Sequence, residues 1–99
     1  MTEPTRDEID RTPGAVVLEF GAEWCPHCQA IRPAMSEMLA KHPHVRHLQV
    51  EDGKGQPLGR SFRVKLWPTL IFLRDGQVVS QAVRPSPEEI AQGFEELFD

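Results

Sequence analysis

The chain lacks several features that would place it at once in a large class of proteins. Only two of its 99 residues are cysteine, too few for the disulfide scaffold of a small secreted domain. Its 11 lysines and arginines are outnumbered by 15 acidic residues, for a net charge of -4, whereas nucleic-acid binders usually present a basic face. No apolar run approaches the roughly 20 residues of a membrane-spanning helix. We therefore expect one globular domain with its own core, and neither a nucleic acid nor a membrane as partner.

The start of the chain, MTEPTRDEIDRTPG, lacks the basic beginning and the apolar stretch of a secretory signal. With Met1 as the native start this predicts a cytoplasmic protein, and in that reducing compartment a disulfide is usually transient and catalytic. Thr5 and Glu8 have the spacing of a capping box, and Pro13-Gly14 should end a short helix. We expect a short helix and a linker over residues 1–14, followed by the main domain over residues 15–99.

The rest of the sequence alternates between strand and helix patterns. The run AVVLEFGA is apolar and rich in β-branched residues, as in a buried strand. From Pro26 to about Lys41 apolar residues recur near the helical period, and Pro33 should kink that helix. The same patterns predict, in order, a strand over about 45–50, a short helix after Gln56, strands on either side of Asp75-Gly76, and a closing helix from Ser86. This order predicts an α/β fold: a small mixed sheet with helices on its faces.

Both cysteines lie in the segment EWCPHC, where the first strand gives way to the helix that begins near Pro26. The N–H groups and the dipole at a helix N-terminus favour negative charge, so the pKa of the Cys25 thiol should be lowered. A protonated His27 would strengthen this effect, and the alternative is an ordinary solvated histidine. Cys28 lies one turn later on the same side and can attack a mixed disulfide formed on Cys25. The spacing therefore predicts a redox site.

Two other interpretations of the cysteine pair stay open, a metal site and a pair of inert buried thiols. Structural zinc needs about four ligands, usually from two such pairs, so a dimer would have to share the ion. A c-type haem needs a histidine directly after the second cysteine, and Gln29 stands there. The histidines outside the motif, His42, His44 and His47, are expected on a solvated loop and a strand end. An approach of His47 to Glu19 across the sheet is the less favoured alternative. The sequence favours the redox interpretation.

Taken together, these features resemble the thioredoxin family. The segment LEFGAEWCPHC is similar to the family's first buried strand and active-site motif, and Pro33 stands at its helix-kinking proline. The segment FRVKLWPTLIFLRDGQVV is similar to the part that carries the family's cis-proline and the hairpin after it. A lone Cys-x-x-Cys is a weak signal, but these features in this order are specific. The resemblance covers residues 15–98, and it implies a thioredoxin-like fold.

The resemblance implies a role for each residue of the motif. Cys25 is the attacking nucleophile, Cys28 is the thiol that releases the substrate, and Trp24 is the aromatic residue beside them. Pro68 is expected to follow a cis peptide bond next to the disulfide. The bend there would expose the backbone of Trp67 for pairing with an extended substrate chain, and plain core packing is the alternative for Trp67.

Glu19 is an acidic residue inside an apolar strand. Because an unpaired buried charge is costly, Glu19 should be near-neutral or should face a polar pocket. The family has a buried aspartate at this position, which assists proton transfer with the resolving cysteine, and Glu19 is one methylene longer. The resemblance therefore implies a proton relay through Glu19, and a water-bridged structural acid is the alternative.

The chain also departs from the family in several places. Pro26-His27 stands where thioredoxins proper have Gly-Pro, and this pair resembles the strongly oxidising bacterial branch, in which such a histidine stabilises the thiolate. Gly21 stands where thioredoxins often have an aromatic residue. Arg84 stands where they usually have a glycine that lines the substrate groove, so it would narrow the groove or favour an acidic substrate. Too few residues precede Ala15 for the family's first strand and helix, so we expect a four-stranded sheet without that edge strand.

The combined prediction is a monomeric thiol–disulfide oxidoreductase that acts on protein disulfides or thiols through Cys25 and Cys28. It would serve electron transport and cell redox homeostasis, with a redox partner such as a thioredoxin reductase-like donor and no bound cofactor or metal. The competing interpretations are a non-catalytic binding module on the same fold and a metal-bridged dimer. Whether the chain acts as a reductant or an oxidant depends on its potential and partners rather than on its fold.

Overall fold

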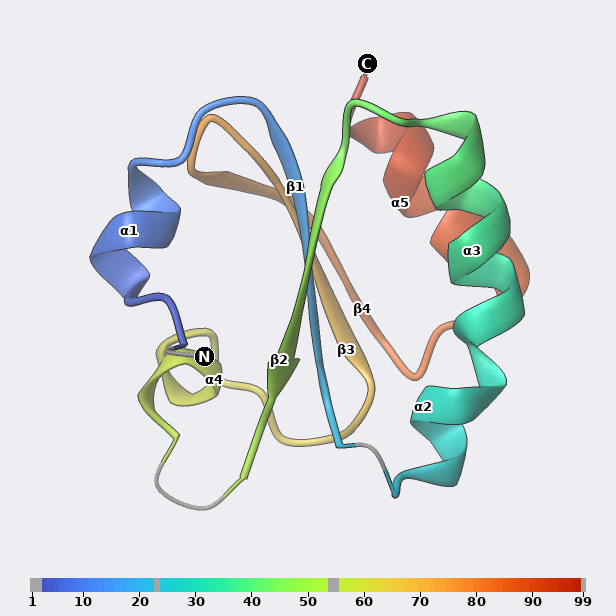
Figure 1. Cartoon of the computed structure of the whole chain (residues 1–99), viewed down its shortest axis with the longest axis horizontal. Helices are drawn as coiled ribbons and strands as arrows, with labels where there is room; N and C mark the ends of the chain where they lie inside the picture. Colours follow the sequence, from blue (N-terminus) through green and yellow to red (C-terminus); the bar gives the residue numbers. More distant parts are fainter. Residues whose placement is uncertain (1–2, 23, 54–55, 99) are drawn as a thin grey trace.

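A computed structural model describes residues 3–22, 24–53 and 56–98 of the chain (Figure 1). Strands and helices alternate along most of it. The elements are α1 (Arg6–Asp10), β1 (Ala15–Gly21), α2 (Pro26–Ala30), α3 (Arg32–Lys41), β2 (Arg46–Glu51), α4 (Pro57–Ser61), β3 (Thr69–Arg74), β4 (Gln77–Val83) and α5 (Pro87–Glu96). None of the helices in these ranges is long and apolar enough to cross a membrane.

The strands form one four-stranded sheet in the order β2-β1-β3-β4. β1 pairs with β2 in parallel and with β3 in antiparallel orientation, and β3 and β4 form an antiparallel hairpin. β1 is a central strand whose residues from Val16 to Phe20 are all buried, which explains its unbroken apolar run. The prediction of a four-stranded mixed sheet is confirmed.

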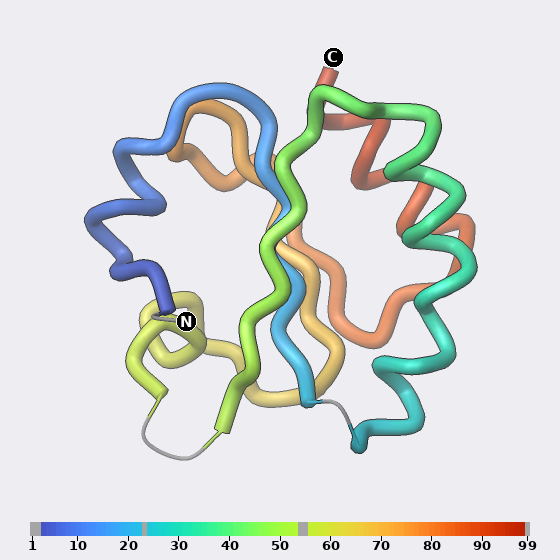
Figure 2. The backbone as a smooth tube through the Cα atoms, viewed as in Figure 1, coloured from blue at the N-terminus to red at the C-terminus, as the bar shows by residue number. Residues whose placement is uncertain are grey.

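Helices cover both faces of this sheet (Figures 1 and 2). α1 and α4 lie on one side of the sheet, and α2, α3 and α5 lie on the other. Side chains alternate along β1, so Leu18 belongs to the core under α1 and α4, whereas Val17 belongs to the core under α3 and α5. Ile9 of α1 is buried in the first of these cores, so this helix is packed onto the sheet.

Local sequence signals account for several element boundaries. α1 begins with a capping box between Thr5 and Glu8, and α5 begins with one between Ser86 and Glu89. Asp75 and Gly76, with φ values of 52° and 81°, form the tight turn between β3 and β4. Positive φ at both central residues is the geometry that suits the twist of a hairpin.

The predicted single helix over 26–41 is instead two helices. α2 ends at Ala30, and α3 begins at Arg32 after a break at Ile31. Pro33 has no N–H to donate to the carbonyl four residues earlier, and its ring collides with that carbonyl in a continuous helix. The kink that the sequence predicts is therefore a full interruption, which sets the short α2 apart from the helix that packs on the core.

Candidate active site

The cysteine pair lies at one edge of the sheet, where the ends of four strands meet the N-terminus of α2. The register places the amino end of β3 (Thr69) beside the carboxyl end of β1 (Phe20), and the carboxyl end of β4 (Val83) beside the amino end of β3. β2 is parallel to β1 and so ends at this edge too. Figure 1 shows the N-terminus of α2 at the same edge. The end of a parallel strand is a common place for chemistry in α/β sheets.

Cys25 is the N-cap residue of α2, and Pro26 follows it in the first turn, where a missing N–H costs nothing. The Cys25 Sγ accepts a hydrogen bond from the backbone N–H of Cys28 at 3.3 Å. Burial is the largest influence and raises the pKa of Cys25, but the Cys28 thiol, the backbone N–H groups of Cys28 and His27, and the charge of Arg84 outweigh it. The net effect is a lowered pKa for the Cys25 thiol.

Cys28, in the first turn of α2, has the opposite character. The pKa of its thiol is raised to about 11, mostly by burial and further by the hydrogen bond to Cys25 and the charges of Cys25 and Glu19. A backbone hydrogen bond from Ala22 opposes this rise without cancelling it. The sulfur lies against the backbone of Gly21, where an added Cβ would come within 2.6 Å of Cys28 Sγ. Cys28 is thus a protonated thiol in a tight pocket.

This asymmetry defines what the pair can do chemically. Both cysteines are free thiols in this structure, and Cys25 is the one whose thiolate is stabilised. A thiolate is the nucleophile in disulfide exchange, and a second thiol beside it can resolve the mixed disulfide that forms. Cys28 is placed to do this but must first lose its proton.

Two tryptophans line the approach to Cys25. Trp24 is 70% exposed, and its ring meets that of Trp67 edge-on with 5.6 Å between centroids. Trp67 is half-buried and packs against the two cysteines, and its Nε1 donates a 2.8 Å hydrogen bond to Asp52 Oδ2. The peptide bond between Trp67 and Pro68 is cis. Trp67 therefore belongs to the packing around the cysteines and at the same time borders the surface beside them.

Arg84 lies between β4 and α5 and reaches across to the same loop. Its backbone N–H donates to Pro68 O at 2.8 Å, and its Nε donates to Trp67 O at 2.9 Å. Its φ of 46° lies in the left-handed region, which a bulky residue seldom adopts. Its charge also reaches Cys25. The structure thus brings together Arg84, the tryptophans, the proline and the cysteines that the sequence singles out.

Glu19 lies behind the cysteine pair and has a partner that the sequence analysis underrated. It is 7% exposed, and its Oε1 lies 2.8 Å from His47 Nε2 of β2. The expectation that His47 is a solvated strand-end residue is therefore wrong, as His47 turns inward to the carboxylate. His42 is only partly solvated, because it stacks on Phe94 and Phe98 with ring centroids 5.5 and 5.1 Å away.

Sequence reasoning missed Asp52, which anchors Trp67, and gave too little weight to His47. A signal for both was available, because each lies on or just after the strand that runs parallel to β1. Because β2 is parallel to β1, a residue that directly follows β2 lies at the same edge of the sheet as the cysteines. The side-chain direction in β2 is harder to predict, since its residues follow no regular alternation: exposed and intermediate residues mix with the one buried residue of the strand, Val50.

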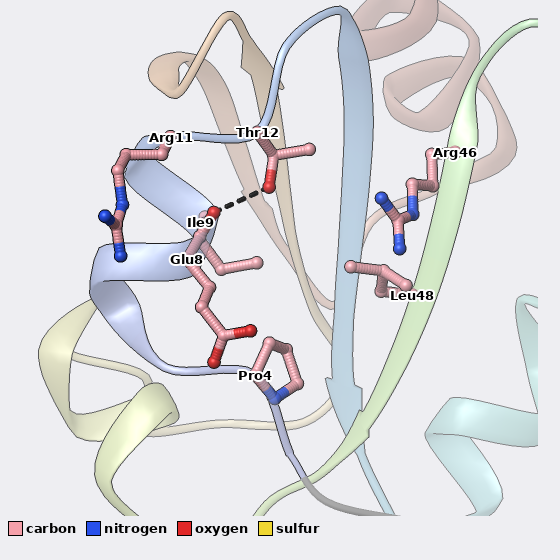
Figure 3. Close-up of a pocket in the computed structure, with 7 residues that line it drawn as sticks. All are labelled: Pro4, Glu8, Ile9, Arg11, Thr12, Arg46 and Leu48. Carbon is pink, nitrogen blue, oxygen red and sulfur yellow. Dashed lines mark hydrogen bonds between the residues drawn. The ribbon is translucent and has the colours of Figure 1, made fainter.

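Other parts of the described chain offer no comparable chemistry. No group of three or more His, Cys, Asp or Glu residues is arranged to hold a metal ion within residues 3–22, 24–53 and 56–98. A pocket of about 340 Å³ opens between α1 and β2 (Figure 3). It is lined by Pro4, Glu8, Ile9, Arg11, Thr12, Arg46 and Leu48, and so lies apart from the cysteine pair.

The geometry of the cysteine pair suits thiol–disulfide exchange, and the chain is similar to known proteins in sequence and fold. The thioredoxin family profile matches residues 3–96 of the chain. The chain is similar to thioredoxin H5 of Arabidopsis thaliana (31% identity over 76% of this chain and 64% of that one). It is also similar to thioredoxin H-type 1 of Nicotiana tabacum (34% identity over 78% of this chain and 61% of that one). The reduced structure of thioredoxin 2 from Pseudomonas aeruginosa PAO1 is similar as well, with 53% identity, a TM-score of 0.85, and coverage of 96% of this chain and 89% of that one.

The chain belongs to the thioredoxin family. It carries the Cys-x-x-Cys couple of these thiol–disulfide oxidoreductases as Cys25 and Cys28, and the predictions of family and fold are confirmed. The matches to the two plant relatives span less than two thirds of those proteins.

Proposed function

We propose that the chain reduces disulfide bonds in protein substrates through the Cys25/Cys28 couple. The observation that carries this proposal is the asymmetry of the pair, one thiol with a lowered pKa at the head of α2 and one whose pKa is raised to about 11 behind it. The similarity to proteins named thioredoxins favours reduction over oxidation as the direction. The Pro26-His27 pair would favour oxidation if the His27 ring stabilised the Cys25 thiolate. In this structure His27 acts on Cys25 through its backbone N–H, so this argument for oxidation does not apply.

The exchange proceeds in two steps. The Cys25 thiolate attacks one sulfur of the substrate disulfide, the substrate S–S bond breaks, and its far sulfur leaves as a thiolate that takes up a proton. Cys28 then loses its proton and attacks the Cys25 sulfur, so that the second substrate thiol is released. The protein ends with a Cys25–Cys28 disulfide, having transferred an electron pair to the substrate, and a redox partner such as a reductase restores the thiols.

We propose that Glu19 accepts the proton that Cys28 loses in the second step. It is the buried carboxylate whose charge acts on that thiol, and a thiol with a pKa of about 11 needs an acceptor near neutral pH. His47 holds Glu19 Oε1 at 2.8 Å and orients the carboxylate. Glu19 is therefore proposed as the proton acceptor in resolution, with His47 as its positioning residue.

The proposed substrate groove consists of four residues that border Cys25: Trp24, Trp67, Pro68 and Arg84. The exposed ring of Trp24 offers apolar contact, and the backbone around Pro68 offers hydrogen bonds to an extended chain. We further propose that the protein acts as a monomer in a reducing compartment such as the cytoplasm, where thiols are kept reduced and a disulfide is usually transient.

The reduction potential of the Cys25–Cys28 couple tests the proposal directly. The protein is equilibrated with glutathione redox buffers, and the free thiols are alkylated and counted by mass. A potential near or below the cytosolic glutathione poise of about -220 to -260 mV is expected. A value well above it, towards the about -120 mV of a strong oxidant, would reverse the proposed direction. Failure to form any internal disulfide would remove the redox function altogether.

A further inference from the structure

Arg84 is held in an unusual conformation for its residue type. Arg63, Asp75 and Arg84 are the non-glycine residues with positive φ in the described ranges, and Asp75 is of a type that tolerates this region in turns. Arg84 keeps its φ of 46° while its backbone N–H and its Nε bind the consecutive carbonyls of Pro68 and Trp67. Residues kept in sparsely populated conformations by their surroundings cluster at functional sites.

The Trp67 carbonyl that Arg84 binds is a main-chain acceptor next to the reacting sulfur. Main-chain groups of this kind pair with an extended peptide that adds to a protein surface. The guanidinium of Arg84 lies on this carbonyl, at 2.9 Å. A substrate chain that pairs with Trp67 must therefore share the carbonyl with Arg84 or displace it.

Arg84 has no carboxylate partner in the described part of the chain. Its side chain is exposed and its Nε–H binds Trp67 O, and no residue in the described ranges uses the remaining N–H groups of the guanidinium, which can therefore bind an anion. Exposed apolar residues stand beside Arg84 and its partner Trp67: Val83 (48% exposed) precedes Arg84, Leu66 (48%) precedes Trp67, and Trp24 (70%) meets the Trp67 ring. The positive charge is also close enough to Cys25 to lower the pKa of that thiol.

We propose that Arg84 selects disulfides in which an Asp or Glu flanks the reacting substrate cysteine. The substrate carboxylate binds the guanidinium and draws it from the Trp67 carbonyl, and the freed carbonyl accepts a hydrogen bond from the substrate backbone. A neutral or basic substrate must break the Arg84–Trp67 contact without this compensation. This inference rests on the proposed function, since it concerns the substrates of the same exchange.

The test uses short peptides with one cysteine joined to 2-thiopyridine by a disulfide, identical except for Glu, Gln or Lys next to that cysteine. The Cys25 thiolate attacks the peptide sulfur, and pyridine-2-thione leaves as a coloured product, so its appearance reports the first step. We expect the Glu peptide to react about two- to five-fold faster than the Gln peptide, the range of an exposed ion pair, and the Lys peptide to react slowest. High salt should reduce these ratios.

Variants at Arg84 and a matched arginine separate charge selection from a general effect. Arg84→Gln should bring the three rates together, and Arg84→Glu should reverse their order. Arg63→Gln is the control, because Arg63 is also an exposed arginine with positive φ, at 59°, and within the described residues its side chain makes no hydrogen bond to Trp67. The ratio between peptides is the readout rather than the absolute rate, because loss of the Arg84 charge also changes the reactivity of Cys25.

Equal rates for the three peptides with the wild-type protein would overturn the inference, as would a Glu preference that persists in folded Arg84→Gln. Should an Arg84 variant fail to fold, the salt series on the wild-type protein and the Arg84→Lys variant still decide the question. If no peptide releases pyridine-2-thione, the proposed function itself fails. Exchange without charge preference would leave that function intact and remove only the role of Arg84.

Discussion

The two sides of the cysteine pair differ in exposure, charge and purpose. The outer side, defined by Trp24, Trp67 and Arg84 around Cys25, carries a positive charge, and Trp24 and Arg84 there are exposed although Cys25 itself is buried. The inner side, defined by Glu19, Gly21 and His47 around Cys28, is buried or half-buried and carries a carboxylate. The two cysteines therefore differ in pKa: that of Cys25 on the outer side is lowered, and that of Cys28 on the inner side is raised to about 11.

This difference shows that one helical turn is enough to give two cysteines the unlike pKa values of an attacking and a resolving thiol. Cys25 is at the N-cap, where backbone N–H groups point at the sulfur, whereas Cys28 is within the helix and pressed onto the backbone of Gly21. A negative charge is favoured at the first position and resisted at the second. Changes on the outer side should therefore alter attack and substrate choice, and changes on the inner side should alter release.

The largest effect is expected from removing either sulfur. Cys25→Ser should form no mixed disulfide with a peptide disulfide, because the thiolate that attacks is gone. Cys28→Ser should attack once and then stop, so that a mixed disulfide on Cys25 accumulates to one equivalent. Acid quenching followed by mass measurement distinguishes these outcomes. A mixed disulfide found on Cys28 in Cys25→Ser would mean that the inner thiol attacks as well, and would break the comparison.

A large but smaller effect is expected from Glu19→Gln. As a proton acceptor Glu19 speeds the release step, so its loss should prolong the mixed disulfide by about 10²-fold, the lower end of a general acid–base contribution. Its charge alone has the opposite consequence, because Glu19 raises the pKa of Cys28 and its removal would make the thiolate easier to form. The decay of the mixed disulfide after mixing with a peptide disulfide gives the sign.

Two further variants make the Glu19 experiment specific. Glu51→Gln is the matched control, since Glu51 is an exposed glutamate at the end of β2 and its register partner is Gly21 of β1. It should leave the decay rate as in the wild type. His47→Gln removes the ring that holds Glu19 and should slow release less than Glu19→Gln does. Release that is unchanged or faster in Glu19→Gln would leave Glu19 as a structural acid and would end the proposed relay.

The sequence was sufficient for the elements whose signals are local. The capping box at Thr5, the helix start at Ser86, the turn at Asp75-Gly76 and the buried run of β1 each depend on a few neighbouring residues, and each is in the structure as expected. The motif predicted the family for the same reason. The break at Ile31 was underestimated, because the cost of an interior proline can be met by a kink or by a full interruption.

Contacts between distant segments could not be predicted in the same way. The pairing of His47 with Glu19 joins two strands, and the bond from Trp67 to Asp52 joins two loops. Such contacts depend on register and side-chain direction, which a period of apolar residues along one strand does not fix. They are nevertheless the contacts that orient the two sides of the cysteine pair.

The smallest effect is expected at His27, and it tests how the outer side stabilises its thiolate. Because the pKa of Cys25 is lowered from 9.0, the midpoint of its alkylation profile should lie below that pH, whereas the midpoint for Cys28 should lie at about pH 11. His27→Ala keeps the backbone N–H that reaches Cys25, so the Cys25 midpoint should move less in this variant than in Arg84→Gln, where loss of the positive charge should raise it. Alkylation of each cysteine, followed by mass across pH, measures both midpoints. A larger upward shift in His27→Ala than in Arg84→Gln would show that the imidazole charge holds the thiolate, and would make the couple more oxidising than proposed here.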